Sequence, residues 1–109
     1  PNLLSLRIDE SLYFANAAYL EEIIYDQIAE HKDVGHVILM CPAINEIDLS
    51  ALEALDEINQ RLRELGIGFH LSEVKGPVMD ALEKTEFLAQ LAGKVYLSHH
   101  AAVLELGRP

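Results

Sequence analysis

The sequence is short of cysteine and of basic residues, and each shortage argues against a class of protein. Its single cysteine, Cys41, has no intrachain disulfide partner, so we expect a reduced, cytosolic setting. Only eight residues are Lys or Arg, against 18 Asp and Glu, which gives a net charge of -10. Because a nucleic-acid binder needs clustered Lys and Arg, and these are scattered, we expect no nucleic-acid partner.

Long hydrophobic runs are also missing. The longest unbroken one, residues 37–44, has eight residues, whereas a membrane-spanning helix needs about 20. No basic and apolar signal segment opens the chain. We therefore expect a soluble piece that does not itself insert into a membrane. Because it starts with Pro1 and not with methionine, we expect it to come from a longer protein.

Apolar residues are plentiful, at 50% of 109 residues, which is enough for one domain with one core. Residues 36–41 are apolar on consecutive positions, the pattern of a strand buried on both faces at the centre of a sheet. Pro42 ends that strand. The next helix is predicted to bury one stripe and to end at Gly66 in a left-handed conformation. The members of this stripe are Leu52, Leu55, Ile58, Leu62 and Leu65.

The start of that helix carries a capping pattern. Ser50 and Glu53 have the spacing of a capping box, in which the serine hydroxyl accepts from a first-turn amide. We therefore predict that Ser50 caps the helix. The segment before it, from Asn45 to Asp48, is predicted to be a loop.

Strands and helices alternate along the chain, which is typical of an α/β fold with a mostly parallel sheet. The predicted strands are 3–8, 12–14 (closing a hairpin with the first), 36–41, 68–72 and 94–97. The predicted helices run from a cap at Asn16 to about 31, over 50–65, from Pro77 to about 82, over a short turn at 87–91, and from a cap at Ser98 to the C-terminus.

Candidate metal ligands and nucleophiles are poorly arranged. The pair His31 and His36 would lie at a helix end and a strand start, and the adjacent His99 and His100 point apart, so we predict no metal site. Cys41 has no general base near it in sequence, and burial in a strand raises a thiol pKa. We predict that it is a small core residue.

Cofactor motifs and paired catalytic carboxylates give no better candidates. Residues 66–68 (Gly-Ile-Gly) precede a strand and do not open a helix, so neither a P-loop nor a dinucleotide fingerprint is present. Glu46 and Asp48 lie two apart in a loop, where such residues usually serve turns and caps. We therefore expect no cofactor and no enzymatic activity.

Polar side chains gather where two predicted strands end. Asn45, Asp48 and Ser50 lie at the N-terminus of a helix, where they could hold an anion, contact a partner, or only cap the helix. The turn 72–75 should lie beside them, because the carboxyl ends of parallel strands share one sheet edge. The predicted surface for a protein partner, an anion or a nucleotide consists of Asn45, Glu46, Asp48, Ser50, Ser72 and Lys75.

Three segments, in this order of elements, resemble the STAS domain of sulfate transporters and anti-sigma-factor antagonists. Residues 45–52 (NEIDLSAL) lie between the central strand and the long helix, while 12–17 (LYFANA) and 73–78 (EVKGPV) resemble stretches of the STAS domain of SulP-type anion permeases. The resemblance covers essentially the whole chain. It implies a single STAS-like domain, with a mixed, mostly parallel sheet of four to five strands packed with four to five helices.

The same resemblance implies a function. The STAS domain of a SulP protein lies on the cytoplasmic face of the membrane, at the C-terminus of an anion transporter, and serves regulation and not conduction. Residues 1–109 would then be the regulatory domain of a transporter, with sulfate as the expected anion. Its implied partners are the membrane domain of the same chain, a cytosolic protein and, in some members, a nucleotide. The acidic charge predicts that a cytosolic partner has a basic surface.

A free-standing anti-sigma-factor antagonist is the alternative. Those proteins resemble one another in having a phosphorylated serine directly after the loop aspartate, and the residue at that position here is Leu49. Without a hydroxyl the phosphorylation switch cannot operate there, which favours the transporter. Ser50 remains a possible acceptor.

Overall fold

Within the described residues the sheet has four strands, all parallel, in the order β1-β2-β3-β4. The computed structural model describes residues 2–9 and 14–107. The strands are β1 (Leu3–Arg7), β2 (His36–Met40), β3 (Gly68–Ser72) and β4 (Val95–Tyr96). The helices are α1 (Phe14–Glu30), α2 (Leu49–Glu64), α3 (Gly76–Glu83), α4 (Phe87–Gln90) and α5 (His99–Leu106). The predicted α/β fold is confirmed: the described residues have four strands and five helices, within the four to five implied for each, and these strands are all parallel where a mixed, mostly parallel sheet was implied.

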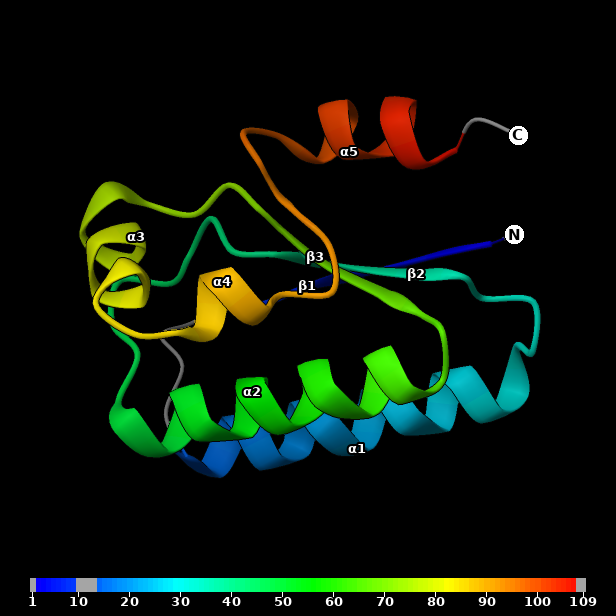
Figure 1. Ribbon diagram of the computed structural model, residues 1–109, viewed down its shortest axis with the longest axis horizontal. Coiled ribbons are helices and arrows are strands. Elements are labelled where there is room, and N and C mark those ends of the chain that lie inside the picture. The colour runs from blue at the N-terminus through cyan, green and yellow to red at the C-terminus, as the bar shows by residue number, and fades with distance from the viewer. Residues whose placement is uncertain (1, 10–13, 108–109) are drawn as a thin grey trace.

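The helices form layers on both sides of the sheet (Figure 1). α1 and α2 pack against each other and cover one face, whereas α5 covers the other. α3 and α4 lie at the end of the molecule where β2 gives way to the loop that leads into α2 (Figure 1). Because β2 and β3 are parallel neighbours, the loops that follow them leave the sheet at the same edge.

The central position predicted for residues 36–41 is confirmed, because β2 pairs with β1 on one side and β3 on the other. Val37, Ile38 and Leu39 are fully buried. Consecutive residues of a strand face opposite sides, so a strand buried on consecutive positions must be covered on both faces. The consecutive apolar residues of β2 are therefore explained by the helices that cover both faces of the sheet.

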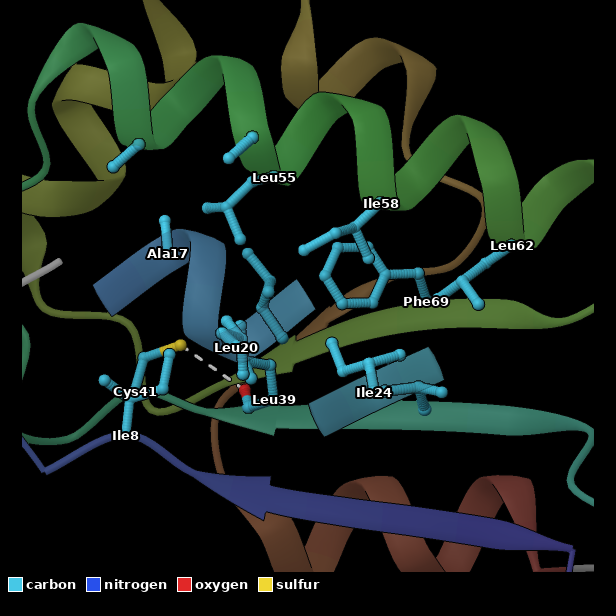
Figure 2. Packing of buried hydrophobic residues seen from close by; sticks show 14 of the residues in the cluster. Ile8, Ala17, Leu20, Ile24, Leu39, Cys41, Leu55, Ile58, Leu62 and Phe69 are labelled. Carbon is cyan, nitrogen blue, oxygen red and sulfur yellow. Dashed lines mark hydrogen bonds between the residues drawn. The ribbon is translucent and has the colours of Figure 1, made fainter. Parts of the chain in front are cut away.

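The main core lies between the sheet and the helices α1 and α2 (Figure 2). Of the predicted α2 stripe, Leu55, Ile58 and Leu62 are buried, whereas Leu65 is 53% exposed. Gly66 has the left-handed conformation that was predicted, with φ of 74°. The amide of Ile67 donates to the carbonyl of Leu62 at 2.8 Å, which closes the helix end.

Two predictions at helix N-termini are wrong. Asp48, and not Ser50, caps α2: its Oδ1 accepts from the amide of Ala51 at 2.7 Å. Ser50 lies inside the first turn of the helix. Asn16 lies inside α1 and does not cap it, since α1 begins at Phe14. The predicted hairpin strand 12–14 is contradicted at Phe14, and residues 12 and 13 lie outside the described part.

The face beneath α5 is more polar than the main core. The Nδ1 of His36 and the Nε2 of His70 are 3.0 Å apart, and the amide of Lys94 donates to the Nδ1 of His70 at 3.0 Å. A Cβ at Gly68 would come within 2.7 Å of the His70 ring, and one at Gly93 within 2.4 Å. Both glycines therefore make room for the imidazole of His70.

Candidate interaction surface at the carboxyl ends of the strands

The loops that follow β2 and β3 meet, as the sequence predicts. The Nζ of Lys75 donates to the Oδ1 of Asn45 at 2.6 Å, across 30 positions of the sequence. Both side chains are exposed. The parallel pairing of β2 with β3 causes this meeting, because it carries both carboxyl ends to one edge.

A groove of about 390 Å³ opens beside this contact. One wall is the loop before α2, which contributes the polar groups and Ile47, and the other is α3, which contributes apolar groups. The lining residues are Asn45, Glu46, Ile47, Asp48, Pro77, Val78 and Ala81. We name it the loop groove. Its mixture of apolar floor and polar rim suits contact with a protein or a small ligand.

Asp48 has a structural task in this groove. Its Oδ1 is engaged by the Ala51 amide, which the start of a helix would otherwise leave without a partner. Its backbone carbonyl accepts from Leu52 at 3.0 Å. Asp48 therefore fixes the loop against α2, and the groove keeps its shape through ordinary helix capping.

The two predicted serines are separated from the other predicted residues. Ser72 is fully buried at the end of β3, and its Oγ has no hydrogen-bond partner among the described residues. Its side chain therefore does not reach the surface. Ser50 is exposed, but it lines a different hollow, of about 140 Å³, together with Glu21 and Glu53. The structure thus brings together Asn45, Glu46, Asp48 and Lys75.

Cys41 follows β2 directly and is 4% exposed. Burial raises the pKa of its thiol to about 12, although the backbone of Ser72 opposes that shift. Its Sγ donates weakly to the carbonyl of Leu39 at 3.4 Å. A protonated and buried thiol is a poor nucleophile, so the predicted role as a small core residue is confirmed.

Metal ligands do not cluster in the part of the chain that the structure describes. No group of three or more His, Cys, Asp or Glu residues there could hold a metal ion. His99 instead contributes to the contact between α5 and β1, with its Nε2 2.8 Å from the Oγ of Ser5. The amide of His99 donates to Glu73 at 2.8 Å.

Sequence reasoning missed the apolar side of the loop groove. Val78 lies in the helix predicted from Pro77 to about 82, and it is 4% exposed. Pro77 occupies the start of α3, and Lys75 is the N-cap. Nothing in the residue pattern said that α3 packs beside the loop before α2, because that placement depends on the path of the chain after β3. The proline at position 77 indicated where the helix begins, but not where the helix packs.

Comparison with protein-family models gives one family for nearly the whole chain. The model described as STAS domain matches residues 1–102. The chain is 31% identical over 106 residues to sulfate transporter 3.1 of Arabidopsis thaliana, which covers 89% of this chain. It is 27% identical to high affinity sulfate transporter 2 of Stylosanthes hamata, over 98% of this chain. The chain spans only 16% and 18% of these relatives' lengths.

Solved structures share the fold. The murine Solute Carrier 26 family member A9, an anion transporter in the inward-facing state, matches 97% of this chain with a TM-score of 0.82 and 19% identity, over 18% of its own length. A proposed anti-sigma factor antagonist of Thermotoga maritima matches 98% of this chain and 89% of its own, with a TM-score of 0.83 and 19% identity. Within the described residues, no helix has the length and apolar character needed to cross a membrane.

Proposed function

The chain belongs to the STAS domain family, and on that premise we propose that it is the cytosolic regulatory domain at the C-terminus of a SulP-type transporter of an inorganic anion, sulfate. The observation that carries this proposal is the 31% identity to a plant sulfate transporter over 89% of the chain. The small share of that relative which the chain spans supports a second, membrane-embedded part in the parent protein.

The proposed domain acts by contact and not by catalysis. The loop groove would contact the membrane domain of the same transporter, a cytosolic regulatory protein or a nucleotide, through Asn45, Glu46, Asp48 and Lys75. Asn45 and Lys75 are exposed and already hold one geometry, so a partner would meet an ordered surface. Ser50 and Ser72 contribute least to this proposal, because one lies outside the groove and the other is buried.

The gene that encodes the chain tests the transporter proposal. We expect several hydrophobic segments of about 20 residues each to be encoded upstream of Pro1, in one reading frame with it. An initiator methionine within a few codons of Pro1 would overturn the proposal, because the chain would then be free-standing.

A free-standing phosphorylation-switch protein that binds an anti-sigma kinase is the second candidate. It is supported by the match to the Thermotoga maritima structure, which extends over 89% of that chain. Leu49 opposes it, because a leucine offers no hydroxyl to a kinase. Incubation with an anti-sigma serine kinase and ATP, followed by intact mass measurement, tests it: we expect no added phosphate, and one phosphate per chain on Ser50 would favour this second candidate.

A further inference from the structure

A second groove lies between the first two turns of α2 and the segment that leads into and forms α4. It has a volume of about 210 Å³. We name it the α2–α4 groove. Its lining combines apolar side chains, carboxylates and two uncharged polar residues: Leu49, Leu52, Phe87, Glu53, Asp56, Glu86, Thr85 and Gln90.

The walls of this groove are held in place by a buried side chain. Asn59 of α2 is fully buried, and its Nδ2 donates to the carbonyl of Gln90 at 2.8 Å. Its Oδ1 accepts from the amide of Ala92, also at 2.8 Å. The side chain of Arg63 donates to the same Gln90 carbonyl. α4 is therefore fixed to α2, and the groove needs no rearrangement before it binds.

Leu49 is unusual at this place. It is 69% exposed in the first turn of α2, beside Leu52, which packs against the core, and beside the buried Phe87. A single exposed leucine is ordinary on a protein surface. Here, however, it borders a groove with an apolar floor, so another apolar side chain can be covered on several sides.

The charged groups of the groove have one sign. Every charged residue that lines it is acidic, and the whole chain carries a net charge of -10. The Oδ1 of Asp56 is buried without a hydrogen-bond partner among the described residues, while its Oδ2 is 3.4 Å from the side-chain amide of Gln60. Because Oδ1 is covered, a basic side chain in the groove would meet the Asp56 carboxylate through Oδ2.

We propose that the α2–α4 groove binds a basic segment of a protein partner, with an apolar side chain against Leu49 and Leu52 and flanking Arg or Lys side chains at Glu53, Asp56 and Glu86. This inference rests on the proposed function, since it names the partner chemistry of a domain that acts by contact. A second copy of this chain does not fit, because it would bring further carboxylates to an acidic rim. The groove is small, so the contact is a weak, reversible one.

Three synthetic peptides of equal length test the chemistry. The first has arginines that flank two leucines, the second has serine in place of each leucine, and the third has glutamine in place of each arginine. We expect the ¹⁵N-labelled 109-residue chain to bind the first peptide about tenfold more tightly than either of the others, with amide shifts centred on residues 49–56 and 85–90. Equal binding of the leucine and serine peptides would mean charge attraction without a groove, and would overturn the proposal.

Two substitutions test the location. Leu49→Ser changes an exposed side chain, so the fold should be unaffected while peptide affinity falls about fivefold or more. Leu97→Ser is the matched control, because Leu97 is 95% exposed and does not line the groove. Glu86→Gln should weaken binding, whereas Glu30→Gln on α1 should not.

The outcome separates this inference from the proposed function. Peptide shifts centred on Asn45 and Lys75 would place the basic segment in the loop groove, and would overturn the present inference while leaving a contact domain intact. Absence of shifts at both grooves would overturn it as well. The transporter proposal, in contrast, is tested by the gene upstream of Pro1 and by the kinase assay, and neither result depends on this groove.

Discussion

Asp48 is the residue that caps the start of α2 and lines the loop groove. Its Oδ1 accepts from the Ala51 amide at 2.7 Å, whereas Ser50 is an exposed residue inside the helix. We expect Asp48→Ala to lower the free energy of unfolding by about 1 kcal/mol. Ser50→Ala should change it by no more than about 0.5 kcal/mol. Urea denaturation of both variants checks this, and a larger loss for Ser50→Ala would restore the capping box.

The sequence could not decide between these two caps. Aspartate and serine are both favoured at the N-cap, and the Ser50–Glu53 spacing fits a capping box as well as Asp48 fits a simple cap. The choice depends on where the loop from β2 arrives, which is a property of the whole fold. The burial of Ser72 escaped prediction for the same reason, because a residue at the last position of a strand is exposed or covered according to what packs above it.

His70 makes the stability of the protein depend on pH. Burial, with a smaller contribution from His36, lowers the pKa of His70 to about 4 from its ordinary value of 6.5. Glu105 opposes this shift, Lys94 adds to it, and the ring of Tyr96 lies 5.8 Å from that of His70. The Lys94 amide donates to Nδ1, so the neutral ring carries its proton on Nε2 and donates to His36.

The sign of the pH dependence follows from this lowered pKa. Between pH 6.5 and 4 the unfolded chain binds a proton at His70 that the folded chain does not bind. The free energy of unfolding should therefore fall as the pH is lowered through this window, by at most about 1.4 kcal/mol per pH unit from this group. Denaturation at pH 7 and pH 5 should show a smaller difference for His70→Gln than for the native chain. A His70 ring that titrates near 6.5 by NMR would contradict the assignment.

At the scale of elements, a buried side chain of α2, Asn59, makes two of the hydrogen bonds that hold α4 and the residues after it. Asn59→Ala removes both hydrogen bonds to residues 90 and 92 and leaves the Ala92 amide without its partner. We expect a loss of about 2 kcal/mol or more in the free energy of unfolding, and faster hydrogen exchange at Ala92. Gln60→Ala, at an exposed neighbour, is the control and should change stability by less than about 0.5 kcal/mol. Equal effects of the two substitutions would contradict the role of Asn59.

The elements themselves were largely predictable. Residues 36–40 form a continuous apolar run and 49–64 have a helical apolar period, patterns that local sequence can specify, and the structure has a strand and a helix there. The segment 12–14 is too short for a residue pattern to specify a strand, and Phe14 belongs to α1 instead. Its aromatic residues favour a strand, but the helix that follows incorporates its last member. Propensity over three residues is too weak to compete with an adjacent helix.

At the scale of the whole molecule, the parallel sheet explains why the candidate surface exists. β2 and β3 run side by side, so the loops that follow them meet, and Lys75 contacts Asn45. This meeting was predicted from the order of elements alone, whereas the α2–α4 groove was not. That groove depends on the Asn59 contacts, which join residues more than 30 positions apart. Sequence patterns of one helix contain no information about such a contact.

Anion uptake by the proposed parent transporter is the measurement that tests the account most directly. The Asn45→Ala/Glu46→Ala pair lies in the exposed loop before α2, and Glu30→Ala at the opposite end of the domain removes one carboxylate as a control (Figure 1). With transporter amount at the membrane held equal, we predict reduced labelled-sulfate uptake for the pair and unchanged uptake for the control, while the isolated domains melt within a few degrees of the native one. Uptake by the double variant equal to that of the unmodified protein would contradict a contact function for this surface. So would a loss of uptake that is explained by a lower melting temperature of the domain.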